Sequence, residues 1–382
     1  PVFKQFYNSS NYNSYFNAVN GIDNLRSIQF MRILLKDFSD PVTIRFGTLD
    51  LVRTDWKRYS KNLNSENINY PNTTFDISSV NILENENRVP VNYILPPGVQ
   101  REEISSNNSI IRQNEQSMSI KIVDLQPKDS RAVYKNLDFD MRQYKKLKMF
   151  IHAESIEGEP KLPGEGSSEN FDKRLVGFIR LGSDFTDNYY QIEVPLKPTA
   201  YSQASSNRFS SDQVWIPESN SIDFPLEILT KLKALSITGK SNLSQALYFN
   251  ENLEVIDEFS LISGLPGDKK YKFSIKGNPS TGSIKTLMIG VKNPSTQNGD
   301  VISGEVWFNE LRLSEIDGKG GWAALGSLET NLADVANVSV SGKISTVGFG
   351  SIDKTPNQRS REDYKQFGFI GSADFGKFLP LK

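Results

Sequence analysis

The residues that could do chemistry in this chain are few, and the first is a single histidine. His152 is the only histidine among 382 residues, and there are no cysteines. A chain without cysteine has no thiol nucleophile, no thiolate metal site and no disulfide framework. Neither a nucleophile elbow nor a zinc-binding pair of histidines lies near His152, so the sequence predicts no hydrolase triad. Because His152 lies in the strand-like run 148–153, we expect a half-buried histidine with a structural role.

Carboxylates near predicted strand ends form the second group, because jelly rolls can hold calcium there through carboxylate and carbonyl oxygens. The candidates are Asp138, Asp140, Asp184, Asp187, Asn309 and Glu310. None of them has the Asp-x-Asp-x-Asp-Gly spacing of a calcium loop, so we interpret them as solvated turn residues. We therefore predict no catalytic, cofactor-binding or metal site, and we do not expect an enzyme.

Aromatic residues form the third group, because they could make a platform on which sugar rings stack. The candidates are Tyr189, Tyr190, Trp215 and Trp307. Alternation along a strand puts Tyr189 and Tyr190 on opposite faces, so at most one of them could contribute. Core packing explains most of these aromatic side chains without a ligand.

Charge and length limit the classes of partner. The 44 basic and 45 acidic residues leave a net charge of −1, which gives no electrostatic footprint for nucleic acid. The mean hydropathy is −0.44. No apolar run approaches the ~18 residues of a transmembrane helix, but the strands of a membrane β-barrel would not produce such a run. The length of 382 residues predicts two or three domains.

Strands with alternating apolar and polar residues must position these side chains. The regular signals predict strands over 117–124, 145–153, 174–181, 188–196, 271–276, 284–292 and 304–313. One short helix is predicted over 224–235, where Pro225 precedes leucines at helical spacing. This pattern predicts an all-β fold in which residues 116–317 form an antiparallel, jelly-roll-like β-sandwich.

The N-terminal part looks like the end of a similar domain. The segment 41–53 is echoed by 303–317, and each follows a second strand-like run. We therefore interpret residues 1–59 as the C-terminal strands of a truncated β-domain, so that the chain begins inside a domain. Residues 60–115 are polar and rich in Asn and Pro, and we interpret them as a linker.

The last segment, 318–382, has a different alternation. Between 336 and 345 the apolar residues share one parity and the polar residues share the other, and the pattern resumes over 366–375. Two such strands of about ten residues match the dyad pattern of an outer-membrane β-barrel, although a solvated antiparallel sheet gives the same alternation. In a barrel, Glu329 and Asp334 could line the lumen.

Several stretches together resemble one family. They are 28–59, 134–152, 187–195, 214–235 and 285–334, and the last, with KTLMIGVKNP and VWFNELRLSEID, is the most specific. Together they resemble the SprA/Sov proteins, the outer-membrane translocon of the type IX secretion system, which is also tied to gliding motility. The resemblance covers nearly the whole chain, and the regions 60–115 and 155–172 contribute little to it.

The resemblance implies a very large outer-membrane barrel through which folded cargo leaves the cell. Soluble sandwich modules would be exposed on the periplasmic or extracellular side. The implied partners are a side-gating barrel protein, a plug protein and secreted cargo proteins, and no cofactor or catalytic motif is implied. The residues alone leave one alternative open, a secreted jelly-roll module for carbohydrate binding or adhesion.

Overall fold

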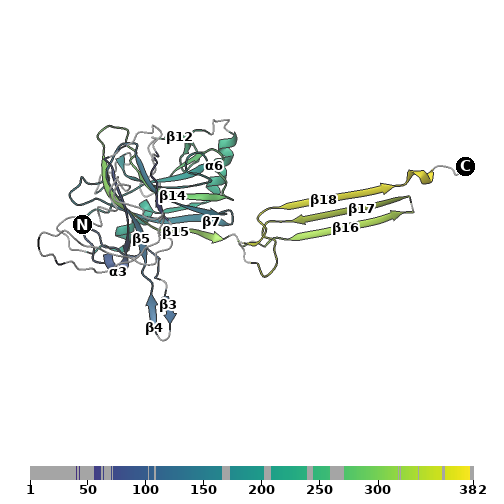
Figure 1. Ribbon diagram of the computed structural model, residues 1–382, viewed down its shortest axis with the longest axis horizontal. Coiled ribbons are helices and arrows are strands. Elements are labelled where there is room, and N and C mark those ends of the chain that lie inside the picture. The colour runs from purple at the N-terminus through teal and green to yellow at the C-terminus, as the bar shows by residue number, and fades with distance from the viewer. Residues whose placement is uncertain are drawn as a thin grey trace. The chain divides into compact units, whose positions relative to one another are not determined.

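The computed structural model describes the chain mainly from residue 56 onward (Figure 1). The described residues are 40, 43, 56–61, 63, 70 and 72–378, apart from 102, 107–108, 166–172, 202–207, 239–243, 259–270, 317, 319, 334 and 355–357. The predicted closing strands of a truncated domain therefore lie outside the described residues. The short strand β1 (Lys57–Arg58), at the end of that segment, pairs with a strand of the sandwich.

Two antiparallel sheets form the sandwich. The first has the order β1-β6-β14-β8-β9-β13-β11-β12 and the second has the order β10-β7-β15-β5-β2. The first sheet contains β6 (Ser130–Phe139), β8 (Val176–Gly182), β9 (Tyr189–Pro195), β11 (Leu247–Phe249), β12 (Val255–Ile256), β13 (Lys272–Lys276) and β14 (Ile284–Lys292). The second contains β2 (Thr74–Asn81), β5 (Gln116–Leu125), β7 (Tyr144–Glu154), β10 (Ile222–Pro225) and β15 (Ile302–Ile316). All seven strands predicted from residue 116 to 313 are present, which confirms the all-β antiparallel fold.

An apolar core unites the two sheets. Fully buried residues of the second sheet, such as Ile120 and Ile151, belong to the same cluster as Ile179, Ile192 and Val291 of the first sheet. Inward-facing residues alternate along each strand, so one face of each sheet supplies this core. Strands β8 and β9 are buried along their whole length, which means that their other face is covered as well.

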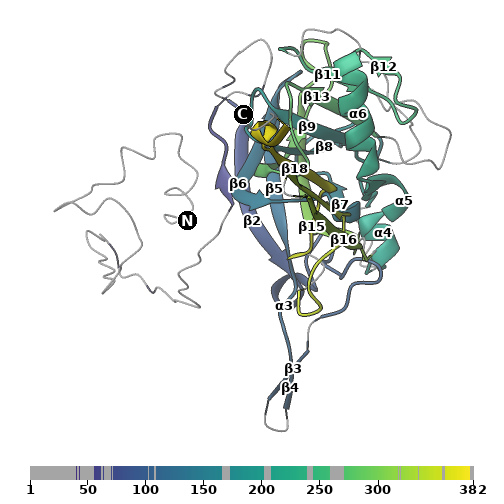
Figure 2. The ribbon, with the colours of Figure 1, turned by 90° about the vertical axis from the view of Figure 1, so that its right-hand side faces the viewer.

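Helices line one side of the two sheets (Figure 2). The predicted helix is present as α6 (Glu227–Thr238), and it buries Leu229 and Leu232 in the core. Its predicted first residues instead belong to strand β10, because Ile222 and Phe224 alternate toward the core. Three short helices were not predicted, namely α3 (Ile82–Asn85), α4 (Ser211–Trp215) and α5 (Pro217–Asn220).

The interpretation of residues 60–115 as a linker is wrong for much of that stretch. Strand β2 pairs with β5 along its length, and Val91 and Tyr93 have no exposed surface. One polar residue of this stretch, Asn81, has a structural role. Its side chain accepts hydrogen bonds from the amides of Leu83 and Glu84 and so caps α3. Only the hairpin of β3 (Glu103–Ser106) and β4 (Ser109–Arg112) forms a separate two-stranded sheet (Figure 1).

The last described strands form a third sheet, with the order β16-β17-β18. Strands β16 (Ala323–Leu332), β17 (Ala336–Ser345) and β18 (Tyr364–Ala373) each contain ten residues and pair without a register shift. A short 3-10 helix, η3 (Phe375–Phe378), follows. Among the described residues, no helix combines the length and the apolar character that a membrane crossing requires.

Candidate functional site

The three-stranded sheet has one apolar face and one polar face. On the apolar face Leu328 lies opposite Val340, and Val340 lies opposite Phe369. The other members of this face are Ala324, Gly326, Thr330, Leu332, Ala336, Val338, Gly342, Ile344, Lys365, Phe367, Gly371 and Ala373. Because the register is continuous, the alternation seen in the sequence becomes a coherent apolar surface across all three strands.

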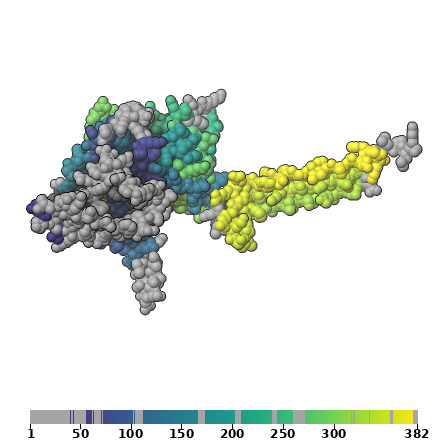
Figure 3. All heavy atoms as spheres, in the orientation of Figure 1, coloured from purple at the N-terminus to yellow at the C-terminus, as the bar shows by residue number. Residues whose placement is uncertain are grey.

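That apolar surface is open to its surroundings. Every residue of β16 is exposed, and Leu328 and Phe369 are 65% and 72% exposed. The space-filling view shows an uncovered face along the sheet (Figure 3). An exposed apolar surface of this kind marks contact with a partner or with lipid, because water alone does not favour it.

The opposite face is mostly polar, with one acidic residue, Glu329, and one basic residue, Lys343, and it also includes Leu325 and Ile370. Along it, Ser327, Ser341 and Gly368 are register partners, as are Glu329, Ser339 and Ile370. A hollow of about 350 Å³ lies among Glu329, Asn331, Asn337, Ser339, Ile370 and Ser372, with Thr330 and Val338 at its border. Glu329 therefore lies on the polar face, as a lumen group would, whereas Asp334 lies outside the described residues.

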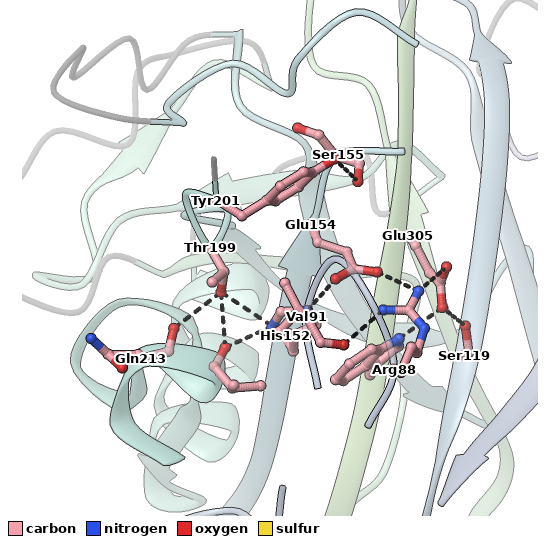
Figure 4. Close-up of polar contacts among 12 residues, drawn as sticks. Arg88, Val91, Ser119, His152, Glu154, Ser155, Thr199, Tyr201, Gln213 and Glu305 are labelled. Carbon is pink, nitrogen blue, oxygen red and sulfur yellow. Dashed lines mark hydrogen bonds and ion pairs between the residues drawn. The ribbon is translucent and has the colours of Figure 1, made fainter. Parts of the chain in front are cut away.

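A buried polar network lies on the outer face of the second sandwich sheet (Figure 4). Its centre is Arg88, from the segment that follows α3, whose guanidinium lies 2.5 Å from Glu154 Oε1 and 2.9 Å from Glu305 Oε2. The carboxylate of Glu305 also accepts hydrogen bonds from Ser119 Oγ and from Trp307 Nε1, both at 2.8 Å. Strand β5 thus supplies Ser119, β7 supplies Glu154, and β15 supplies Glu305 and Trp307. The segment after α3 supplies the cation, Arg88.

His152 extends this network toward α4. Its Nδ1 lies 2.6 Å from the carbonyl oxygen of Val214, and its Nε2 lies 3.4 Å from Glu154 Oε2. Both of these partners, a carbonyl oxygen and a carboxylate oxygen, accept hydrogen bonds. The ring centroid of His152 also lies 4.1 Å from that of Trp307. The expectation of a half-buried histidine is corrected: the side chain is fully buried, because α4 covers this part of β7.

The electrostatics of the network keep the carboxylate of Glu154 ionised. Burial alone would raise the pKa of Glu154, but His152 and Arg88 outweigh burial and hold that pKa below its ordinary value. Burial likewise works against the charged form of Arg88, and the two glutamates more than offset it, so the pKa of Arg88 is raised. The groups satisfy one another inside the protein, and the network therefore ties the segment that carries Arg88, together with Thr199 and helix α4, to the sheet.

The aromatic candidates are core residues. Trp215 and Trp307 have no exposed surface, and together with Tyr93, Val91 and Val214 they form a second apolar cluster outside the second sheet. Tyr190 and Tyr189 are 1% and 7% exposed. None of the four side chains therefore offers a surface for stacking sugar rings.

The carboxylate candidates lie in separate turns or pairs. Burial alone would raise the pKa of Asp184, but hydrogen bonds from the side-chain amide of Asn188 and from the backbone amides of Thr186, Asp187 and Asn188 together outweigh it and lower that pKa to about 2. Asp187 pairs with Lys276 and Glu310 pairs with Arg312. The side-chain amide of Asn309 donates to Glu115, and Asp140 binds arginines. Within the described ranges, no three His, Cys, Asp or Glu side chains gather as a metal site would require.

Sequence reasoning missed Arg88, Glu154 and Glu305. Arg88 and Glu305 are separated by 217 positions, and no spacing rule connects them. The one available signal was a glutamate next to apolar residues in each of two strands, Glu154 at the end of β7 and Glu305 in β15, because a buried glutamate needs a partner.

Comparison with known families adds one finding. The family model SprA_N, described as "Motility related/secretion protein", matches residues 11–382. No curated protein matches the chain significantly.

Proposed function

Because the chain belongs to the SprA_N family of motility-related and secretion proteins, we propose that it is a non-enzymatic part of a large outer-membrane barrel. This barrel would be the translocon of the type IX secretion system, which exports folded cargo and supports gliding motility. The three-stranded sheet would contribute to the barrel wall, and the sandwich would be a module on the periplasmic or extracellular side.

The observation that carries this proposal is the two-faced sheet. Its ten-residue strands match the ~9–11 residues that a tilted strand needs to cross a bilayer. Leu328, Val340 and Phe369 would face lipid, and the serine-rich face would line an aqueous lumen. Neither sandwich sheet covers this apolar face. Lipid contact would remove it from water.

The sandwich would act through its shape. Two packed sheets, with a second apolar cluster outside the second sheet, make a module in which Arg88, Glu154 and Glu305 pair with one another. Such a body can narrow, cap or orient a pore, or present surfaces to partner proteins. It does not need a reacting group or a cofactor for any of these roles, and we expect none.

The proposed partners come from the family resemblance. They are a side-gating barrel protein, a plug protein and the secreted cargo proteins. The near-neutral charge balance of the chain gives no reason to add nucleic acid to them.

Fractionation of cells that carry an epitope-tagged full-length protein tests this proposal. We expect the protein in the outer-membrane fraction, and we expect cargo to accumulate inside cells when its gene is deleted and to be exported again on complementation. A protein found in the soluble or secreted fraction, or a deletion strain that exports cargo normally, would contradict the proposal.

A further inference from the structure

Four charged residues connect the sandwich to the loop between β17 and β18. Asp140 and Arg142 lie in the turn between β6 and β7, and Arg361 and Glu362 lie in the loop. Arg361 Nη1 lies 2.6 Å from Asp140 Oδ2, and Arg142 Nη1 lies 3.2 Å from Glu362 Oε1. Each segment thus supplies one cation and one anion, and each cation binds the anion of the other segment.

The sandwich side of this cluster is held in place before the loop binds. The Asp140 carboxylate accepts hydrogen bonds from the backbone amide of Arg142 at 2.9 Å and from its Nη2 at 2.8 Å. A Cβ atom at Gly282 would lie 2.7 Å from Arg142 Nε, so glycine leaves the space that this guanidinium occupies. Burial alone would raise the pKa of Asp140, but the hydrogen bonds from Arg142 and Arg361 outweigh it and lower that pKa, which keeps the carboxylate charged.

The loop side is ordered by its own backbone. Ser360 donates its amide to the carbonyl of Phe349 and accepts from the amide of Gly348, both at 2.8 Å. The amide of Val347 donates to the side chain of Asp363 at 3.0 Å. These bonds close the loop on both sides of Arg361 and Glu362, so less conformational entropy is lost when the two residues pair with the turn.

The contact depends on charge rather than on close packing. A cavity of about 380 Å³ lies beside the cluster, lined by Asp138, Phe139, Asp140, Gln143, Tyr144, Gly282 and Arg361. Phe139, one of the two aromatic residues in this lining, is itself 39% exposed. A polar contact next to unfilled space can open and close, whereas a packed apolar interface would be fixed.

We propose that Asp140, Arg142, Arg361 and Glu362 form a polar latch that holds the sandwich in one orientation on the three-stranded sheet. When the latch opens, the sandwich moves as a rigid body relative to the three-stranded sheet. The latch does not depend on where the protein resides in the cell, so it can be tested separately from the proposed translocon role.

The two crossed pairs contribute unequally. The Asp140 side chain is 10% exposed and that of Arg361 is 32% exposed, whereas Glu362 is 78% exposed. Because exposed pairs are screened by solvent, the Arg361–Asp140 pair dominates the latch. Removal of Arg361 should therefore have a larger effect than removal of Glu362.

Pulsed electron paramagnetic resonance on the purified full-length protein tests the latch. Nitroxide labels are placed on cysteines that replace Lys121 of β5 and Ser341 of β17, both exposed positions in a stretch that contains no native cysteine. The distance distribution between the labels should be narrow. Arg361→Ala should broaden it, Glu362→Gln should broaden it less, and Lys354→Ala, a change at an exposed lysine of the same loop, should leave it unchanged.

A charge swap separates the latch from a general loss of structure. Asp140→Arg alone should broaden the distribution, and Asp140→Arg combined with Arg361→Asp should narrow it again. Raising the ionic strength from about 0.1 M to about 1 M shortens the Debye length from ~10 Å to ~3 Å and should broaden the native distribution toward that of Arg361→Ala. An unchanged distribution in Arg361→Ala would overturn the proposal, as would a folded double variant that stays as broad as the single one.

Discussion

Strands β15 and β16 follow each other in the chain, yet their surroundings are opposite. The residues from Ile302 to Asn309 in β15 are all buried, whereas every residue of β16 is exposed. Strand β15 pairs on both sides, with β7 and β5, and β16 pairs on one side, with β17, but strand pairing alone does not decide whether a side chain is covered. The difference lies in what covers their side chains.

Each face of β15 contacts a different core. Val306 and Phe308 lie in the core between the two sheets, and Trp307 lies in the outer cluster. In β16, by contrast, Leu328 and Leu332 of the apolar face are 65% and 53% exposed. Burial of one such leucine is worth about 1.5–3 kcal/mol. The sandwich thus obtains its stability from its own residues, while the sheet needs a second surface or a lipid environment to obtain the same gain.

Two tryptophans give the largest contrast between these regions. Trp307 is fully buried, whereas Trp322, at the start of the three-stranded sheet, is 58% exposed. Trp307→Ala should lower the free energy of unfolding of the sandwich by about 3–5 kcal/mol, because it leaves a cavity beside Tyr93 and His152. Trp322→Ala should change it by less than about 0.5 kcal/mol. Urea unfolding followed by circular dichroism measures both changes. Equal losses of unfolding free energy would contradict the idea that the sandwich is stable through its own residues while the three-stranded sheet depends on another surface.

A buried arginine and an exposed one should differ almost as much. Arg88→Met leaves Glu154 and Glu305 without their cation, and the free energy of unfolding should fall by about 3 kcal/mol. Arg112 is the matched control because its pair with Glu103 is exposed, so Arg112→Met should cost at most about 1 kcal/mol. Adding Glu154→Gln and Glu305→Gln to Arg88→Met should recover part of the loss. No recovery would mean that packing, and not uncompensated charge, explains the effect.

Neighbouring residues on the two faces of the sheet test its environment. Val340 lies between Leu328 and Phe369 on the apolar face, whereas Ser341 lies on the polar face. If the apolar face contacts lipid, Val340→Arg should destabilise the inserted protein by about 2–3 kcal/mol and Ser341→Arg by clearly less. The amount of protein in the outer membrane, together with its resistance to heat in detergent gels, measures the effect. Equal effects, or a larger effect of Ser341→Arg, would contradict the proposed barrel wall.

Local pattern was sufficient to predict most of the fold. The seven strands between residues 116 and 313 were predicted because each alternates and ends at turn residues, and the family resemblance is confirmed by the match over 11–382. Strand β2 was missed because Asn81 and its neighbours look like linker residues, although they cap α3 and pair with β5. Whether a polar residue caps a helix or lies free in solvent depends on contacts that local sequence does not encode.

The buried network shows a different limit. His152 and Trp307 were considered one at a time, and each has an ordinary explanation as a strand residue. Their contact, and the role of Arg88 beside them, depend on strand order: β7 and β15 are neighbours in the second sheet although more than a hundred residues separate them. The two faces of the last sheet were predictable, by contrast, because alternation alone fixes them once the strands pair in register.

The smallest predicted effect concerns a turn of the sandwich and its acid stability. Asp184 has a pKa of about 2 in the folded protein, below the ordinary value of 3.8. A carboxyl whose folded pKa is lowered stabilises the protein above pH 3.8, and this contribution is lost as the pH falls toward 2. Because the carboxylate is largely exposed, solvent screening limits the contribution to at most about 1 kcal/mol.

Asp184→Asn removes the titrating carboxyl, since the amide oxygen can still accept from the backbone amides of Thr186, Asp187 and Asn188 but does not titrate in this range. The variant also loses the hydrogen bond that Asn188 Nδ2 donates to Oδ2, and this loss does not depend on pH. The free energy of unfolding of the variant should fall less steeply than that of the native protein between pH 4 and pH 2. Asp353, in the loop between β17 and β18, is the control: its pKa is also lowered, by Ser351, but it supports no part of the sandwich. Asp353→Asn should therefore leave the acid unfolding of the sandwich unchanged. If both variants flatten the pH dependence equally, the loop between β17 and β18 contributes to the stability of the sandwich. The sandwich would then not obtain its stability from its own residues alone.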